Sequence, residues 1–213
     1  MSWDPPEGGK RRGYHHGNLR EALIEAALRL IREKGPGGFT FAEAARAAGV
    51  SPAAPYRHFR DRDELMADVA RRGFEAFAAG LQAAWDQGRP APRAALDRVC
   101  SAYLEFAAKQ PAAYAAMFEA GLRINDHPQL RIAADDAFAV LREACDAVIG
   151  TFPSGHRPPA LMVALHIWSL AHGIASLFAR GDESRRPLPM TPAELLEAGV
   201  LVYFDGLQAT ALG

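Results

Sequence analysis

The chain has 213 residues, of which 49% are hydrophobic and 23% are charged, and its formal net charge is −1. This composition is ordinary for a soluble globular protein of one or two domains, and it excludes a disordered or fibrous chain. Two cysteines, Cys100 and Cys145, are too few for a disulfide framework or a cysteine metal site, so we expect both to be reduced, as in the cytoplasm.

The charge is distributed unevenly along the chain. Residues 10–62 contain eleven Lys and Arg against five Asp and Glu, a net charge of +6, whereas residues 63–213 contain 13 against 18, a net charge of −5. A basic end on an acidic remainder suits a protein that places this end against polyphosphate. Residues 1–13 are expected to be a flexible arm without a signal peptide, in which Lys10, Arg11 and Arg12 either touch DNA or form a solvated tail.

A first helix is predicted to open at Asn18, with Glu21 as its capping partner, and to end at Gly35. A helix-turn-helix pattern follows within residues 39–65. Thr40 can cap the first helix of this pair, and Gly49 can end it in a left-handed conformation. Ser51 can cap the second helix, with Pro52 at its first position and Phe59 near its end. Helix, glycine-containing turn and helix is the arrangement of a DNA-reading motif.

The second helix of this pair has the chemistry of a reading helix. Ala53 and Ala54 are small enough to let its start approach a groove closely. Pro55 removes at most one early hydrogen bond, so we expect the helix to persist. Donors that could meet phosphate oxygens or base edges are Tyr56, Arg57, His58 and Arg62. The alternative is that Tyr56 and His58 only cap a small hydrophobic cluster.

Residues 14–65 resemble the DNA-binding domain of the TetR family of transcriptional regulators. The resemblance rests on residues 40–45 (TFAEAA), 48–51 (AGVS), 56–59 (YRHF) and 62–65 (RDEL), which occur in this order. The sequence departs from the family pattern at Ala44, Pro55 and Arg62, where a larger aliphatic residue, leucine and lysine are usual. The resemblance implies that residues 14–62 form the DNA-binding domain. The residues expected at DNA are Thr40, Ser51, Ala53, Ala54, Tyr56, Arg57, His58, Arg62 and the arm's Lys10, Arg11 and Arg12.

Six further helices are predicted after residue 61, in what we expect to be a C-terminal regulatory and dimerisation domain, residues 63–213. They cover residues 61–87, 93–109, 111–119, 129–149, 160–180 and 191–207. No run of residues has the pattern of a strand, so we predict an all-α fold of about nine helices. Residues 160–179 contain no Asp, Glu, Lys or Arg and are long enough to span a bilayer. Their histidines, serines and alanines favour a buried helix instead, so no membrane partner is expected.

The last two helices carry small residues that could pack closely. Gly199 and Gly206 are seven residues apart, and each glycine costs about 1 kcal/mol relative to alanine inside a helix. TetR-type regulators pair these two helices with those of a second copy, so the resemblance implies a homodimer; packing within one chain is the alternative. The residues predicted for dimerisation are Ala164, Ala171, Ala175, Gly199, Val202 and Gly206.

Trp168, His172 and Gly173 form a W-x-x-x-H-G pattern, which resembles a TetR subgroup named after a tryptophan-histidine-glycine C-terminal domain. His172 is either a core histidine or part of an effector pocket that it shares with Trp168. The same alternatives hold for the aromatic and methionine residues of the middle helices. The residues predicted to bind a ligand are Tyr103, Phe106, Tyr114, Met117, Phe118, Phe138, Trp168 and His172.

The resemblance implies a dimeric, sequence-specific DNA-binding regulator, most often a repressor that an unknown small-molecule effector releases from its operator. A DNA-binding dimer without an effector, or an activator, is the alternative. The sequence contains no catalytic, phosphate-loop or metal-ligand motif, so we predict no enzyme, no catalytic residue, no metal and no cofactor.

Overall fold

The computed structural model describes residues 19–155, 157–179 and 189–210. Over these residues the chain is entirely helical, which confirms the predicted fold class. The elements are α1 (Leu19–Lys34), α2 (Phe41–Ala47), the 3₁₀ helix η1 (Ala54–Arg57), α3 (Arg62–Trp85), η2 (Asp86–Gly88), α4 (Pro92–Lys109), α5 (Pro111–Phe118), η3 (Ile124–Asp126), α6 (Pro128–Gly150), α7 (Ala160–Ala179) and α8 (Pro192–Thr210).

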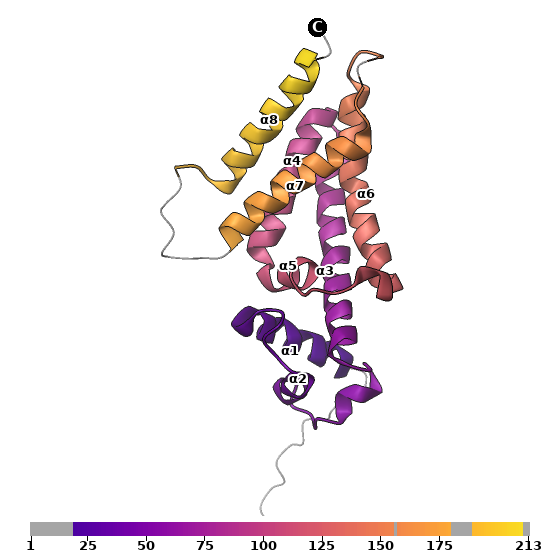
Figure 1. Ribbon diagram of the computed structural model, residues 1–213, viewed down its shortest axis with the longest axis vertical. Coiled ribbons are helices and arrows are strands. Elements are labelled where there is room, and N and C mark those ends of the chain that lie inside the picture. Colours follow the sequence, from indigo (N-terminus) through magenta and orange to yellow (C-terminus); the bar gives the residue numbers. More distant parts are fainter. Residues whose placement is uncertain (1–18, 156, 180–188, 211–213) are drawn as a thin grey trace, which may run out of the picture.

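The helices form a small head and a larger body that share one long helix (Figure 1). We call residues 19–61, with α1, α2 and η1, the head, and residues 92–210, with α4 to α8, the body. Helix α3 starts beside the head and runs through the body, where it packs against α4, α5 and α6. Helix α5 lies between the two parts, because it contacts both α1 of the head and α3. Helices α3 and α5 are therefore the direct connections between the head and the rest of the body.

A cluster of charged side chains joins the head to α3. Asp68 of α3 is 7% exposed, and it is the one buried charged residue among those that the structure describes. Its Oδ1 lies 3.1 Å from Nη2 of Arg20 on α1 and 2.7 Å from Nη2 of Arg71. Arg72 lies 3.4 Å from the other carboxylate oxygen and donates to Glu21 of α1 at 2.6 Å. A buried carboxylate requires such partners, since an unpaired charge is costly away from water.

The contact between α3 and α5 depends on a glycine. A Cβ added at Gly73 would lie 2.8 Å from Sδ of Met117 on α5, closer than a normal van der Waals contact. The absence of a side chain at this position therefore lets α5 approach α3 closely, and it positions Met117 and Phe118 against the interior of the body.

Helix α7 is the one described helix that is long and apolar enough to cross a membrane, judged by length and composition alone. In the structure it packs against α4, α6 and α8, yet only 33% of residues Ala160–Phe178 are buried. The expected buried helix is therefore buried on one face only. The other face is uncharged and exposed.

Candidate nucleic-acid interface and body cavity

The segment after α2 forms a single 3₁₀ turn and not the α-helix that we predicted. Ala54 N donates to Ser51 O at 3.0 Å and His58 N donates to Pro55 O at 2.9 Å, both three residues apart. Pro55 has no N–H, so the bond to Ser51 O that an α-helix needs at this position cannot form. The turn also lacks a side-chain cap, so the predicted capping role of Ser51 is wrong. The reading element is in the predicted place, but its helix type differs.

One side of the turn is buried against the head, and the other side is exposed to solvent. Pro55 and Phe59 are buried beneath it, whereas Arg57 and His58 are exposed. Tyr56 is 64% exposed, and its ring packs edge to face on Phe41 of α2, with centroids 5.1 Å apart. Tyr56 therefore touches a hydrophobic neighbour without being buried by it. The hydrogen-bond donors are available on the surface, as an interface with DNA requires.

The other residues expected at DNA are placed as follows. Ser51 and Ala53 are exposed beside the turn, and Ala54 is half-buried. Thr40 is exposed at the start of α2, where its Oγ1 accepts from Glu43 N at 3.2 Å and completes a capping box. A hydrogen bond from Lys34 and the bonds from Thr40 lower the pKa of Glu43 to about 2. Lys10, Arg11 and Arg12 lie outside the described residues.

Arg62 has a structural role that the sequence did not reveal. Its Nε donates to Phe39 O at 2.8 Å, its Nη2 donates to Pro36 O, and its guanidinium lies 4.7 Å from the centroid of the Phe39 ring. The side chain is only 26% exposed. In the structure the guanidinium holds the loop between α1 and α2 against the start of α3, and a contact of Arg62 with DNA stays a prediction.

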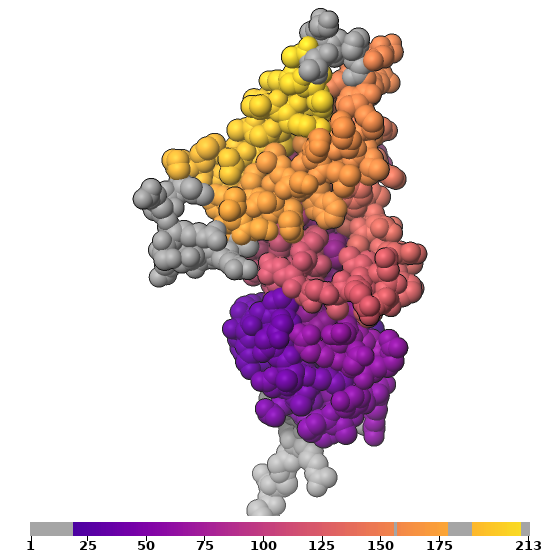
Figure 2. All heavy atoms as spheres, in the orientation of Figure 1, coloured from indigo at the N-terminus to yellow at the C-terminus, as the bar shows by residue number. Residues whose placement is uncertain are grey.

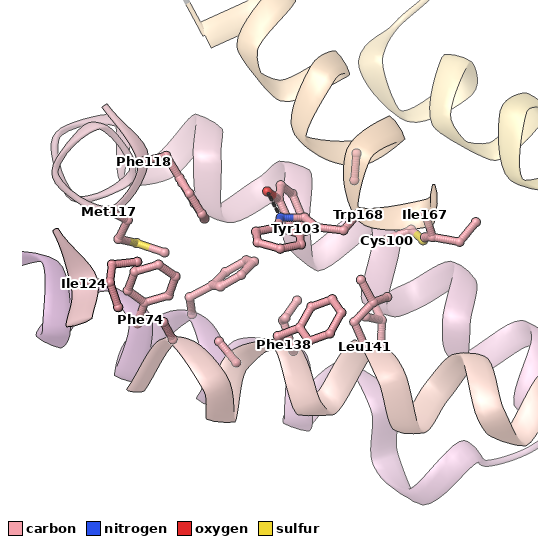
Figure 3. Close-up of a pocket in the computed structure, with 16 residues that line it drawn as sticks. Phe74, Cys100, Tyr103, Met117, Phe118, Ile124, Phe138, Leu141, Ile167 and Trp168 are labelled. Atoms are coloured by element: carbon pink, nitrogen blue, oxygen red, sulfur yellow. Dashed lines mark hydrogen bonds between the residues drawn. The ribbon is translucent and has the colours of Figure 1, made fainter. Parts of the chain in front are cut away.

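The body contains an apolar cavity of about 120 Å³, enclosed by helices α3 to α7 and η3 (Figure 3). Five of the eight residues predicted to bind a ligand line it, namely Tyr103, Met117, Phe118, Phe138 and Trp168. We did not predict the wall that α3 supplies, which consists of Phe74, Phe77 and Leu81, nor Cys100, Ile124, Leu141 and Ile167. Their helical spacing marks an apolar face, but the sequence does not show which apolar residues surround an empty space.

Three predicted ligand residues lie outside this lining. Phe106 packs on Phe77, with ring centroids 5.0 Å apart, so it supports the wall from behind. Tyr114 and His172 lie behind Tyr103: the Tyr114 hydroxyl is 2.7 Å from Nδ1 of His172 and 3.3 Å from the Tyr103 hydroxyl. None of these three residues lines the cavity, and their role in ligand binding stays a prediction.

A chain of hydrogen bonds runs from the cavity wall into this second layer. Nε1 of Trp168 donates to the Tyr103 hydroxyl at 3.1 Å (Figure 3). The Tyr103 hydroxyl in turn lies 3.2 Å from Nδ1 of His172. Burial lowers the pKa of His172 and raises the pKa of both Tyr103 and Tyr114. All three groups are therefore uncharged at neutral pH, and Nδ1 of a neutral His172 can accept the bond from Tyr114.

Helices α7 and α8 lie side by side along one flank of the body (Figure 2). Within the chain, a Cβ at Gly199 would lie 2.7 Å from Cδ2 of Leu170, so this glycine serves the contact between the two helices. Ala164, Ala171 and Ala175 are at most 4% exposed. These four residues are thus used inside one chain, and the expectation that they form a face for a second copy is corrected.

The exposed side of the same two helices is apolar. It carries six large side chains that are between 37% and 71% exposed: Leu161, Met162, Leu165, Leu177, Leu201 and Val202. On α7, Ser169, Gly173 and Ser176 are exposed between them, and an added Cβ at Gly173 would meet nothing within 4 Å. Small residues between apolar ones leave room for another helix at close range.

Two family descriptions match the chain. The family described as "Bacterial regulatory proteins, tetR family" matches residues 23–69, and "Tetracyclin repressor-like, C-terminal domain" matches residues 96–203, about half of the chain. The first match contains the helix-turn-helix, and the second contains α5, α6 and α7, which supply much of the cavity wall.

Two curated regulators are similar to parts of the chain. The HTH-type transcriptional regulator BetI of Rhizobium meliloti (strain 1021) is 33% identical over 118 residues, which cover 53% of this chain and 57% of that protein. The HTH-type transcriptional regulator AcrR of Shigella flexneri is 36% identical over 50 residues, which cover 24% of this chain and 23% of that protein. The similarity thus spans little more than half of the one and about a quarter of the other.

Solved structures match over nearly the whole chain. A protein of unknown function from Rhodococcus sp. RHA1 is 27% identical, with a TM-score of 0.74, over 93% of this chain and 99% of that one. The TetR family transcriptional regulator PfmR from Thermus thermophilus is 20% identical, with a TM-score of 0.64, over 88% and 97%, which shows a shared fold. Family matches at both ends of the chain lead to one conclusion: this protein belongs to the TetR family of DNA-binding transcriptional regulators, which are not enzymes.

Proposed function

We propose that this regulator is a homodimeric repressor that leaves its operator when a small molecule occupies the body cavity. The observation that carries the proposal is the continuity of α3. Its first two turns are tied to the head through Arg62 and Asp68, and three of its later residues, Phe74, Phe77 and Leu81, line the cavity. A ligand that pushes on this wall also moves the base on which the reading turn stands.

Helix α5 offers a second connection between ligand and head. Met117 and Phe118 of α5 line the cavity, and the same helix contacts α1. Binding can shift the head only if the ligand prefers one arrangement of these helices over the other. Coupling of about 1–3 kcal/mol, typical of allosteric proteins, would lower operator affinity by roughly 5- to 150-fold.

The dimer is proposed on the exposed face of α7 and α8. This face combines Leu165, Val202 and their apolar neighbours with the small Ser169 and Gly173, and its part on α7 has no charged residue. A second copy across a two-fold axis would cover the same face on both chains. It would also present two reading turns to a palindromic site. We propose that the chain acts in the cytoplasm, where its DNA is.

The W-x-x-x-H-G pattern supports placing the chain in the tryptophan-histidine-glycine subgroup, as part of this proposal. Trp168 belongs to the cavity wall, His172 to the hydrogen-bonded layer behind it, and Gly173 to the exposed face of α7. The three residues would thus serve ligand binding, support of the wall and pairing of two chains, respectively.

At the DNA, we propose that Tyr56 and His58 contact phosphates and that Arg57 reads a base edge. The decisive experiment is a salt-dependent fluorescence anisotropy titration with duplexes from beside the protein's own gene. We expect specific binding of a dimer, with log K falling linearly as log salt rises. A matched set of scrambled duplexes is the control. A monomer in sedimentation equilibrium, or equal affinity for both sets of duplexes, contradicts the proposal.

A further inference from the structure

The lining of the body cavity is aromatic, apolar and uncharged. Its sixteen lining residues include six aromatic rings, from Phe74, Phe77, Tyr103, Phe118, Phe138 and Trp168, and none of the sixteen carries a charge. The thiol of Cys100 also faces it, and burial raises the pKa of this thiol to about 12, so it is neutral. A charged ligand would lose its hydration here without gaining a partner, which is costly in an apolar site.

The two strongest hydrogen-bonding groups of the lining already have protein partners. Trp168 gives its only N–H to the Tyr103 hydroxyl, and the Tyr103 hydroxyl in turn lies within hydrogen-bond distance of Tyr114 and His172. In one consistent arrangement Trp168 donates to Tyr103, Tyr103 to Tyr114, and Tyr114 to His172. A polar ligand group would have to break one of these bonds to find a donor.

The volume of the cavity matches a ligand of a single ring. Its volume is about 120 Å³, and a dry apolar cavity of roughly 150 Å³ holds benzene. The surrounding rings already pack edge to face: Phe77 on Tyr103 at 5.0 Å and Phe74 on Phe118 at 5.3 Å between centroids. A planar aromatic guest could extend this pattern, whereas a flexible chain would lose conformational freedom for contacts of the same kind.

We infer that the cavity binds small, uncharged monocyclic arenes, and that the Tyr103 hydroxyl excludes polar analogues because it occupies the Trp168 N–H. The regulatory meaning of this inference rests on the proposed function, but the binding itself does not.

The test is isothermal titration calorimetry on the full-length protein without DNA. Toluene is the probe, benzoate supplies the same ring with a charge, and n-hexane supplies an apolar chain. We expect toluene to bind about 100-fold or more tightly than benzoate, and more tightly than hexane. Equal or tighter binding of benzoate, equal binding of hexane, or no heat with toluene up to its solubility limit would overturn the inference.

Two variants locate the site. Ala137→Leu places a larger side chain at a position that lines the cavity and is 2% exposed, and it should abolish toluene binding. Ala79→Leu, on the exposed side of α3, is the matched control and should bind as the wild type does. If Ala137→Leu does not fold, Val99→Ile adds a single methyl group to the same lining and should weaken toluene binding several-fold. Unchanged affinity in a folded lining variant contradicts the assignment.

The relative affinity for two ligands tests the role of Tyr103. Tyr103→Phe leaves the Trp168 N–H without its acceptor, so a ligand with a carbonyl can accept that bond. The ratio of acetophenone affinity to toluene affinity should therefore rise about 5-fold in this variant. An unchanged ratio, or a wild type that already prefers acetophenone, contradicts the exclusion by Tyr103.

A parallel anisotropy measurement separates this inference from the proposed function. Toluene that binds in calorimetry but leaves operator affinity unchanged supports the ligand class and contradicts effector release. Operator release by another compound, together with no toluene binding, contradicts the ligand class and leaves the repressor proposal standing.

Discussion

Both parts of the molecule have a hydrophobic core, but in the head charged side chains also join the elements to one another and to α3, whereas rings and small residues surround the cavity of the body. Arg62 secures the loop between α1 and α2, and Asp68 joins three arginines at the base of the head. The polar groups of the cavity region are instead neutral and bonded to one another. The difference indicates that electrostatic pairing adds to the packing of the head, while the cavity region of the body depends on shape. The following predictions test that contrast, from the largest expected effect to the smallest.

Asp68→Asn should give the largest loss of stability. The change leaves Arg20, Arg71 and Arg72 beside a neutral group, and removing one partner of a buried ion pair typically costs about 3–5 kcal/mol. Asp63→Asn is the matched control, since the Asp63 side chain is 70% exposed and lies 3.5 Å from Arg62, so it should change stability by less than about 1 kcal/mol. Urea unfolding measures the stability of both variants. If the two variants unfold at similar urea concentrations, the head does not depend on the ion pairs of Asp68.

Leu165→Glu should separate the two copies and weaken operator binding about 100-fold, roughly 2.8 kcal/mol. The charge is placed on the exposed uncharged face of α7, where a second copy would bury it. Ile132→Glu on α6 alters a side chain of similar exposure, 49% against 43%, and serves as the control. Analytical ultracentrifugation gives the mass. A dimer that persists in the Leu165 variant places the interface on another face.

Arg57 and Arg62 should give opposite results, although both belong to the basic end of the chain. Arg57→Ala should cost about 1–3 kcal/mol in operator binding and relax sequence preference, with little effect on folding. Arg62→Ala should instead lower the free energy of unfolding by about 1–3 kcal/mol, because two backbone carbonyls lose their donor. Anisotropy and thermal unfolding of both variants test the pair. An Arg62 variant of normal stability but poor DNA binding would restore the expectation from sequence.

The smallest effect concerns pH. Burial lowers the pKa of His172, and the more distant charge of Glu119 opposes this only in part. The unfolded histidine therefore takes up a proton near pH 6.5, before the folded one does. Stability from this group is complete above that pH and is lost as pH falls toward the folded pKa. In the wild type the free energy of unfolding should decline between pH 7.5 and 5, and His172→Gln should reduce this decline by on the order of 0.5 kcal/mol, after screening by solvent. Urea unfolding at a series of pH values measures it. Equal declines in the variant and the wild type would contradict this prediction.

Much of the fold could be predicted from sequence, because helix signals are local. Thr40, Gly49 and the prolines at 92, 111 and 192 mark the ends of helices that the structure confirms to within a few residues. The helix type at Pro55 was missed because a missing N–H can be accommodated in two ways, either as a gap in an α-helix or as a change to a 3₁₀ turn. The hydrogen bonds of the neighbouring residues decide between these two conformations, and a sequence motif does not reveal those bonds.

The site was harder to predict, because periodicity shows which face of a helix is apolar but not what covers it. Ala164 and Leu165 are adjacent, yet one is buried under its own chain and the other is exposed. Met117 lines the cavity while Tyr114, one turn earlier, lies behind it. Arg62 has the charge of a phosphate ligand, and only the position of Phe39 O reveals its internal role. These distinctions depend on contacts between elements far apart in sequence.

The 3₁₀ turn η1, with Pro55 inside it and Pro52 shortly before it, has a consequence for the kinetics of recognition. Pro52 and Pro55 each fix one backbone dihedral, φ, at about −65°, so this segment has fewer conformations to lose when it meets a groove. Docking then resembles a rigid-body event more than induced fit. A chain of this design should search DNA without repeatedly folding and unfolding its reading surface, and it should discriminate among sites mainly by how quickly it leaves them.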